Sequence, residues 1–271
     1  MMQMPPGMRD LFDKIMLYEG ANCFSEVLQP WLQTHAYGQY LNRLDPNHMS
    51  EEDNWELYAL SRVLDILTLG FQPNHQADSS NWPGPGISGK EYLECIHLLG
   101  LQPVYPQAYH PFHCEILEAR AGQHDFEVIQ YAWPAVKLNN LLIKRSGAVI
   151  SSIASDDELN CMNHAALYWA YRRKNRPCRD LSQGWGSNSQ WCTRFRLDVE
   201  TEDTFIYNLD GEFLLNNPTA EEYDELNEQG FKTTEEAIEL VRNRQFIKCT
   251  LNDGDLFPYD FKYIETKSVT P

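Results

Sequence analysis

The stretch FRLDVETEDTFIYNL, residues 195–209, indicates how this chain folds. An acidic turn at residues 200–203 separates two runs in which apolar residues alternate with polar ones, namely Phe195, Leu197 and Val199, then Phe205, Tyr207 and Leu209. Alternation with a period of two is typical of strands that bury one face, so the two runs predict a β-hairpin. Hairpins, in contrast to strand–helix–strand units, build antiparallel or mixed sheets.

Further elements are predicted on both sides of this hairpin. Upstream, apolar-rich runs predict two more hairpins, which join residues 112–117 to 126–131 and residues 141–143 to 148–150. A helix is predicted at residues 163–174. Downstream, the capping boxes Thr219-x-x-Glu222 and Thr233-x-x-Glu236 begin two helices, and residues 246–251 are predicted as the last strand.

The first hundred residues indicate helices. Ser50 and Ser88 each begin an N-cap motif, and apolar residues follow at three- and four-residue steps. The predicted helices span residues 9–18, 23–33, 50–70 and 88–100. We therefore expect an α+β fold, in which a helical N-terminal part (residues 1–100) packs on an antiparallel or mixed sheet with C-terminal helices (residues 101–271). The two parts form either separate units or one continuous domain.

Composition and net charge indicate the cellular compartment and the class of partner. The net charge of −17 disfavours binding to nucleic acid or to an anionic membrane, because phosphate groups would be repelled. No apolar run reaches the ~18 residues of a membrane-spanning helix, and the N-terminus lacks the apolar region of a signal peptide. Seven cysteines, an odd number without a C-x-x-C pair, favour free thiols in a reducing cytosol. We expect a cytoplasmic protein, and no motif indicates a cofactor.

Charge is distributed unevenly along the sequence. Residues 172–196 hold seven basic residues and one acidic residue, whereas residues 198–239 hold fourteen acidic residues and one lysine. The second segment predicts an acidic surface that docks a basic protein partner. The residues proposed for that surface are Glu200, Glu202, Asp203, Glu221, Glu222, Asp224 and Glu225.

Residues 84–90, GPGISGK, match the spacing of two phosphate-binding motifs. Both motifs require a buried strand before the glycines, but residues 74–82 are polar. The motif also requires Ser or Thr after the lysine, where this chain has Glu91. A Gly/Pro-rich loop that leads into the capping box at Ser88 explains the same residues, so nucleotide binding is not predicted.

Residues 110–115, HPFHCE, gather imidazole, thiol and carboxylate groups. On a strand, His113 and Glu115 would point to one face, where they resemble two metal ligands or a base with its orienting partner. The structural alternative is a half-buried edge strand with polar residues facing water. His110, His113 and Glu115 are therefore the candidate catalytic residues of an alternative, enzymatic function.

The segment from Arg172 to Trp191 is the second candidate site. Its arginines are suited to carboxylate or phosphate, and its glycines and polar side chains are typical of a binding loop. A structural corner anchored by two tryptophans explains these features equally well. The residues proposed for binding are Arg172, Arg173, Arg176, Trp185, Ser187, Asn188, Gln190 and Trp191.

The segments YWAYRR (168–173), DLSQGWGSNSQW (180–191) and DLFPYD (255–260) resemble a family of uncharacterised bacterial proteins. No catalytic residues are implied by that resemblance. In its general character, as a solitary acidic α+β protein, the chain also resembles the immunity proteins that neutralise bacterial toxins by binding them.

These observations favour a cytosolic binding protein of the immunity or antitoxin type, which occludes a basic toxin domain through its acidic surface. One alternative is an enzyme, such as a metal-assisted hydrolase, with a site between residues 172–191 and His110, His113 and Glu115. A further alternative is a small-anion sensor that uses the arginine cluster.

Overall fold

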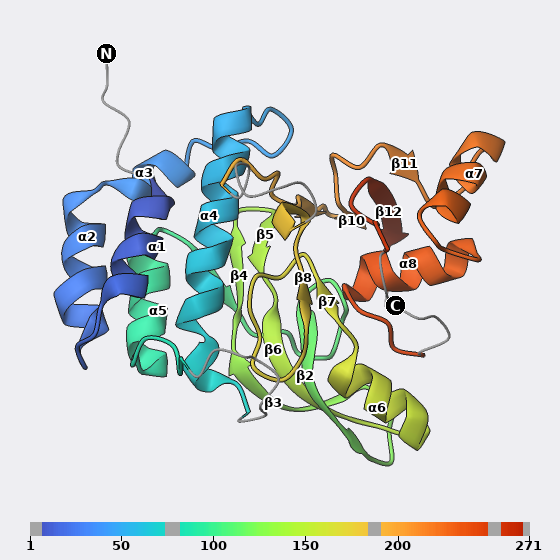
Figure 1. The fold of residues 1–271 in the computed structure, drawn as a ribbon, viewed down its shortest axis with the longest axis horizontal. Coiled ribbons are helices and arrows are strands. Elements are labelled where there is room, and N and C mark those ends of the chain that lie inside the picture. The colour runs from blue at the N-terminus through green and yellow to red at the C-terminus, as the bar shows by residue number, and fades with distance from the viewer. Residues whose placement is uncertain (1–6, 74–81, 184–190, 249–255, 268–271) are drawn as a thin grey trace.

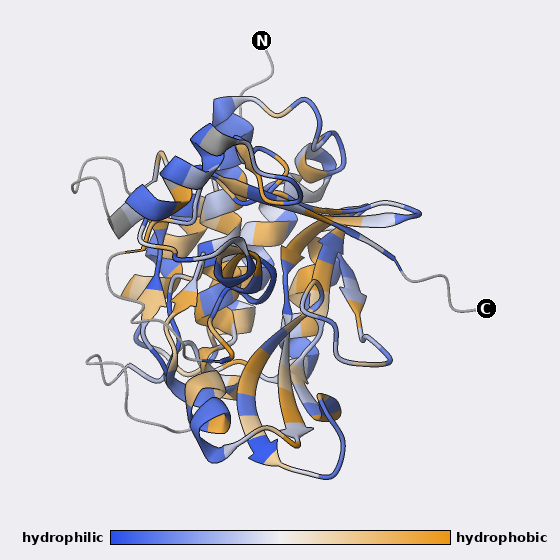
Figure 2. Cartoon of the chain, turned by 90° about the vertical axis from the view of Figure 1, so that its right-hand side faces the viewer, coloured by the Kyte–Doolittle hydropathy of each residue, from blue (hydrophilic) through white to orange (hydrophobic). Residues whose placement is uncertain are grey.

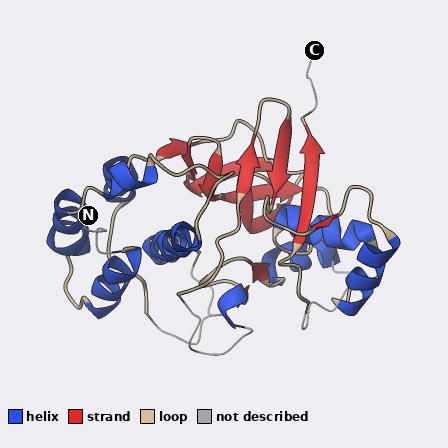
Figure 3. Ribbon diagram, turned by 90° about the horizontal axis from the view of Figure 1, so that it is seen from above, coloured by secondary structure: helices blue, strands red, loops and turns tan. Residues whose placement is uncertain are grey.

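Two mixed β-sheets lie at the centre of the computed structural model, with helices on either side (Figures 1 and 3). The described residues are 7–73, 82–183, 191–248 and 256–267. Over these residues the α+β class predicted from the sequence is confirmed. Predictions for residues 74–81, which include most of the expected surface loop, and for residues 249–251 lie outside the described part.

The N-terminal helices lie together on one side of the sheets (Figure 1). They are α1 (Met8–Leu17), a π-helical turn (Phe24–Leu28), α2 (Gln29–Thr34), α3 (Tyr37–Leu41), α4 (Glu51–Leu67), a 3₁₀ turn (Leu69–Phe71) and α5 (Gly89–Leu98). Complete capping boxes begin α4 at Ser50 and α5 at Ser88, because each serine side chain accepts a bond from the backbone three residues later. The four predicted helical regions are confirmed, whereas α3 was not predicted.

Over the described residues, the larger sheet has seven strands in the order β1-β4-β5-β9-β10-β12-β11, in which β11 and β12 pair parallel and the other neighbours pair antiparallel. Its strands are β1 (Gln102–Val104), β4 (Ala135–Leu138), β5 (Leu141–Lys144), β9 (Asp198–Glu200), β10 (Thr204–Tyr207), β11 (Phe213–Leu214) and β12 (Phe261–Thr266). Strands β9 and β10 pair antiparallel, with Val199 opposite Ile206. The hairpin predicted at residues 195–209 is therefore confirmed.

The smaller sheet corrects the other two predicted hairpins. It contains β2 (Cys114–Ala121), β6 (Ser146–Ser152) and β3 (Glu127–Trp133), and β6 lies between the other two. Residues 112–117 and 126–131 therefore do not pair with each other, because β6 pairs parallel with β2 and antiparallel with β3. Residues 141–143 and 148–150 do not pair either, because β5 belongs to the larger sheet. Every residue of β6 is buried, which explains its central place.

Two predictions in the C-terminal half are wrong. The helix expected at residues 163–174 is instead α6 (Asp156–His164), which a capping box at Ser155 begins. The chain continues into β7 (Leu167–Tyr168), which pairs with β8 (Cys178–Arg179), and Trp169 then adopts a left-handed backbone with φ 51°. Of the strand predicted at residues 246–251, the described residues 246–248 form no strand, and β12 is the last strand among the described residues.

The helices predicted at the two C-terminal capping boxes are confirmed as α7 (Ala220–Glu228) and α8 (Thr234–Asn243). Both lie on the opposite side of the sheets from α1–α5 (Figure 1). A 3₁₀ turn at Leu181–Gln183 completes the helical elements of the described residues.

The largest hydrophobic cluster crosses the predicted boundary at residue 100. It combines side chains of the N-terminal helices, such as Leu57 and Ile66 of α4, with Trp133, Leu141 and Leu197 from strands or their flanks. Figure 2 shows apolar residues along the strands and in the helices that face them. The helices thus pack on the sheet as predicted, while the division into parts at residue 100 stays a prediction.

Five cysteines, at positions 23, 95, 114, 178 and 192, are free thiols. Cys161 differs, because it is disulfide-bonded, so the prediction of free thiols is wrong at that position. None of the helices in the described part of the chain is long and apolar enough to cross a membrane.

Candidate functional site

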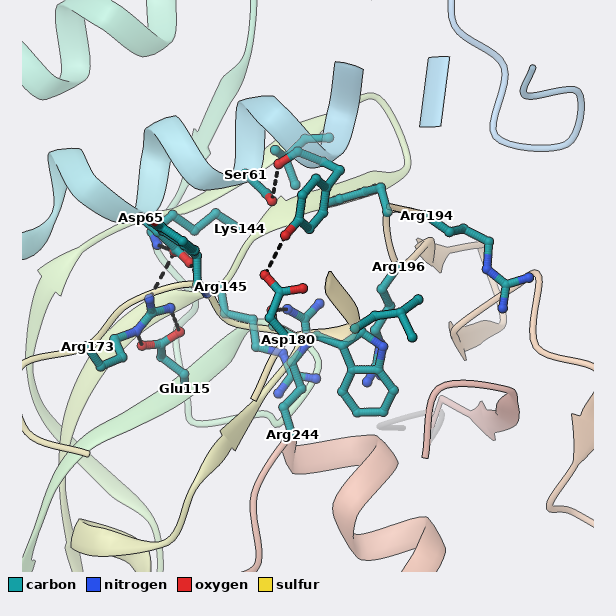
Figure 4. A pocket seen from close by; sticks show the side chains of 16 residues that line it. Ser61, Asp65, Glu115, Lys144, Arg145, Arg173, Asp180, Arg194, Arg196 and Arg244 are labelled. Atoms are coloured by element: carbon teal, nitrogen blue, oxygen red, sulfur yellow. Dashed lines mark hydrogen bonds and ion pairs between the residues drawn. The ribbon is translucent and has the colours of Figure 1, made fainter. Parts of the chain in front are cut away.

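Helix α4 and the strands next to it enclose a cavity of about 40 Å³ (Figure 4). Its walls come from α4, β2, β5 and the loops that follow β7 and precede β9. Nine of the side chains that line it are Asp, Glu, Lys or Arg, so the centre of this fold is charged as well as apolar.

On one wall of the cavity, four buried charged side chains form a continuous ion-pair network. Arg173 donates from Nε and Nη2 to the two oxygens of Glu115, at 2.7 and 2.8 Å. Its Nη1 lies 3.0 Å from Asp65 Oδ1, which also accepts a short bond from Lys144 Nζ. The backbone N–H of Tyr171 donates to the second oxygen of Asp65. Two carboxylates and two cations balance each other here, as buried charges require.

Both carboxylates of this network are held in the charged form. Burial by itself would raise the pKa of Asp65, but Arg173 and Lys144 lower it well below the usual range. Burial also acts to raise the pKa of Glu115, and the Arg173 guanidinium reverses the shift, so that this pKa is lowered too. Protonation of either group therefore works against the folded state.

On the other wall, three arginines surround one carboxylate, Asp198 of β9. Arg196 Nε donates to Oδ1 at 2.7 Å, Arg244 Nη2 donates to Oδ2 at 2.9 Å, and Arg145 Nη2 lies 3.8 Å from Oδ2. The backbone N–H of Asn208 also donates to Oδ1. Burial acts to raise the pKa of Asp198, but the arginines lower it well below its usual range. Figure 4 shows these arginines on different sides of Asp180.

The three guanidiniums have more donors than partners. Four of their buried N–H positions have no hydrogen-bond partner in the structure: Arg145 Nε, Arg145 Nη1, Arg196 Nη1 and Arg244 Nε. Burial lowers the pKa of Arg145 to about 9 and that of Arg196 to about 10, and the neighbouring like charges add to both shifts. At neutral pH both side chains still carry their charge.

Asp180 lies between the two walls. Its carboxylate accepts a 2.6 Å bond from the Tyr58 hydroxyl and a 3.1 Å bond from the backbone N–H of Ser182. Arg62 is its nearest cation, at 3.8 Å. Burial raises the pKa of Asp180, in contrast to Asp65 and Asp198.

The arginines predicted as a binding loop are mostly part of the interior. Arg173 belongs to the first network, and Arg176 Nη2 donates to the backbone oxygen of Met162 at 2.7 Å. Burial lowers the pKa of Arg176 to about 10. Arg172 is half-buried and lies over the Trp82 ring. Arg173 and Arg176 are therefore part of the core, and the three arginines do not form one exposed cluster.

Trp191, at the end of the predicted loop, packs against α1 and α4. Its ring makes an edge contact with Phe12 and lies 4.7 Å from the Arg62 guanidinium. Trp185, Ser187, Asn188 and Gln190 lie outside the described residues, so their predicted binding role stays a prediction.

The three candidate catalytic residues have different partners. Glu115 pairs with Arg173 inside the cavity wall, whereas His113 Nε2 lies 3.2 Å from Glu200 Oε2 in the larger sheet. His110 Nδ1 accepts a bond from the backbone of Phe112, and burial lowers the pKa of His110 to about 4. Glu115 is thus connected to the predicted loop through Arg173, whereas His110 and His113 lie beside each other, with ring centroids 6.3 Å apart, next to carboxylates of the larger sheet. The enzyme alternative stays a prediction.

The residues of the predicted acidic surface are in different environments. Glu200 is part of an ion cluster, since it accepts bonds from Lys137 Nζ at 2.7 Å and Lys267 Nζ at 2.8 Å. The hydrogen bond from His113, together with the two lysines, lowers the pKa of Glu200 although burial opposes the shift. Among the described side chains of that surface, Glu202, Asp203, Glu221 and Asp224 are exposed.

Glu222, which is half-buried, caps the start of α7 through the backbone of Thr219. The side chain of Glu225 lies outside the described part of the structure. The acidic surface predicted from the sequence is therefore reduced to the β9–β10 turn and the exposed face of α7.

A groove of about 650 Å³ adds a second acidic feature, which sequence reasoning missed. It lies between α6 and α8 and is closed by residues 125–126 and 153–154. Its acidic lining residues are Asp125, Glu158, Glu235, Glu236 and Glu239. Its apolar lining residues are Phe126, Ile153, Ala154, Met162, Ile238 and Ile247. We name this feature the acidic groove.

Two basic residues, Arg242 and Lys248, also line the acidic groove. Arg242 is paired with Glu265 of β12, at 2.5 Å, so its charge is already balanced from outside the groove. Ile153 is 66% exposed and is therefore open to contact from a partner. The groove thus combines apolar side chains with an excess of carboxylates.

No group of three His, Cys, Asp or Glu side chains within residues 7–73, 82–183, 191–248 and 256–267 is arranged to hold a metal ion. Described residues 82–88 before α5 form no strand, so the GPGISGK segment has the capping role expected of it. Comparison of the chain with protein-family models, with curated proteins and with solved structures finds no match. The resemblances to an uncharacterised bacterial family and to immunity proteins therefore stay predictions.

Proposed function

We propose that this chain is a cytosolic binding protein of the immunity or antitoxin type, which neutralises a toxin by docking a basic segment of it. The observation that supports the proposal is the acidic groove between α6 and α8, which is lined by six apolar side chains and five carboxylates. Stable protein interfaces combine apolar and polar contacts, and the groove offers side chains for both.

The chemistry of the groove defines the segment that fits it. Exposed Ile153, with Phe126 and Ile247 nearby in the lining, favours an apolar anchor residue from the partner. The surrounding carboxylates of α8, Glu235 and Glu239 among them, favour Lys or Arg on either side of that anchor. The whole chain, with a net charge of −17, would attract a cationic partner from a distance and repel polyanions.

Inhibition by occlusion requires no catalytic group in the inhibitor. A cationic toxin domain that acts on nucleic acid or on an anionic surface would present the basic side chains that the groove favours. The protein would thereby act as a polyanion mimic, and its association with the toxin would slow as salt is added.

The experiment that tests this function is affinity capture of the tagged, full-length protein from its native cells, with elution by a salt gradient and identification by mass spectrometry. The proposal expects one basic protein in stoichiometric amount, released at moderate salt, whose toxicity is suppressed when the two are co-expressed. Capture of no basic protein at any salt concentration, or unchanged toxicity on co-expression, would contradict it.

A further inference from the structure

We propose that the internal cavity binds a small oxyanion of the phosphate class, held by Arg145, Arg196 and Arg244. This site is separate from the acidic groove and does not depend on the proposed function.

The buried positive charges around Asp198 exceed the carboxylates near them. The Asp65, Glu115, Lys144 and Arg173 network is neutral, and Asp180 has Arg62 as its nearest cation. Arg194, which lines the same cavity, is paired with Asp260 at 3.0 Å. The three arginines around Asp198, in contrast, leave two positive charges without a carboxylate. Buried charge without a counter-charge is strongly unfavourable, and a doubly charged anion would supply what is missing.

The unpartnered donors show where an anion would bind. Arg145 and Arg196 are 1% and 4% exposed, yet together with Arg244 they keep four N–H positions without an acceptor. All three side chains line the cavity, and Figure 4 shows them converging from β5–β6, the approach to β9 and the end of α8. Guanidinium groups bind phosphate through paired N–H donors, so the donor set matches the ligand class.

The size of the cavity excludes large ligands. A volume of about 40 Å³ holds a few water-sized groups, since one water needs roughly 10–15 Å³ by this measure. Inorganic phosphate or sulfate has this size, whereas a nucleotide does not. Asp180 also lines the space and would oppose an anion when ionised, but burial raises its pKa and Tyr58 donates to it. The effect of the three arginines, which favour an anion, is therefore larger than that of Asp180, which would oppose it.

Calorimetric titration with sodium phosphate tests the proposal, with sodium chloride of equal ionic strength as the reference ligand. We expect one phosphate per chain and a rise in the melting temperature with phosphate that chloride does not reproduce. In Arg244→Gln, which removes the least buried of the three guanidiniums, phosphate affinity should fall by at least about tenfold. Arg120→Gln removes an exposed arginine paired with Glu118 and should leave affinity unchanged.

A second readout does not depend on any variant. The Nε–H resonances of buried arginines in the wild-type protein should shift during the phosphate titration, since Arg145 Nε and Arg244 Nε have no partner without it. A response to phosphate no greater than to chloride, or unshifted Nε–H resonances, would overturn the proposal. Equal phosphate affinity in folded Arg244→Gln and in the wild type would overturn it as well.

Discussion

Arg173 shows how much of this fold depends on single buried charges. Its guanidinium bridges Glu115 of β2 and Asp65 of α4, so one side chain ties the smaller sheet to the N-terminal helices. Lys144 of β5 completes the network from the larger sheet. Removing Arg173 would leave two carboxylates buried with one cation between them.

We therefore expect Arg173→Met to lower the free energy of unfolding by about 3–5 kcal/mol, the usual cost of breaking a buried ion pair. Urea denaturation followed by circular dichroism measures the change. The control is Arg120→Gln, which removes an exposed arginine and should leave the denaturation midpoint in place. Equal midpoints for Arg173→Met and the wild type would show that the network does not stabilise the fold.

His110 gives the stability of the protein a predictable pH dependence. Burial lowers its pKa from 6.5 to about 4, while its ring also faces Glu265, His113, Arg242 and Arg145. The unfolded chain takes up this proton at a higher pH than the folded chain does. The stability contributed by neutral His110 is thus complete above pH 6.5 and is lost as the pH falls towards 4.

Between pH 6.5 and 4, the unfolding free energy of the wild type should decrease with falling pH, and His110→Gln should show a smaller decrease. Thermal denaturation across this pH range compares the two proteins. Parallel pH profiles would contradict a buried neutral histidine. At pH values below about 4, the unfolded chain also takes up protons on Asp65, Glu115 and Asp198, whose pKa values are lowered in the folded chain, so the stability of both proteins should fall further.

The sequence identified Arg173 and Arg176 as unusual but not as buried. Arginine clusters in sequence are normally exposed, and nothing local to residues 172–176 shows that Glu115 lies against them. Asp65 and Asp198 were not predicted as buried ion-pair partners either. Each is a lone acid among apolar residues of a helix or strand, and its partners are far away in the sequence. Pairing across 50 to 100 residues depends on the tertiary fold, which local patterns do not encode.

At the scale of elements, β6 shows where reasoning from pattern fails. The Arg145-Ser146-Gly147 segment has the composition of a turn, yet Ser146 and Gly147 are in β6 and pair with β2. Strand β6 is buried throughout and lies between β2 and β3, so its pairing is decided by burial and not by the nearest apolar run. Where apolar alternation and a short acidic turn agreed, as in β9 and β10, the prediction was right.

Gly147 is required by packing within this sheet. A Cβ there would lie 2.7 Å from the Trp133 ring, which is fully buried and held by a bond from Nε1 to the Arg145 carbonyl. Gly147→Ala should therefore cost about 1–3 kcal/mol of stability through overpacking. Gly89→Ala, in the first turn of α5, meets no atom within 4 Å and should be neutral or stabilising. Chemical denaturation measures the free energy of unfolding of both variants. Equal effects at the two positions would contradict overpacking at Gly147.

At the scale of the whole molecule, charge is sorted into an interior and a surface. The arginines of residues 172–196 largely join buried networks, while the carboxylates of residues 221–239 mostly stay at the surface of α7 and α8. The excess of acidic residues is thereby concentrated outside. The sequence predicted an acidic binding surface but not the acidic groove, because Asp125, Ile153 and Glu235 come together only in the folded chain.

We propose that the acidic groove, and not net charge alone, binds the basic partner. Two double variants separate these causes because they change the net charge equally: Asp125→Lys/Glu235→Lys in the groove and Glu221→Lys/Asp224→Lys on α7. In capture from native cells, we expect the groove variant to lose the basic partner and the α7 variant to retain it, with release at somewhat lower salt. Equal retention of the partner by the two variants would show that the groove is not the binding site.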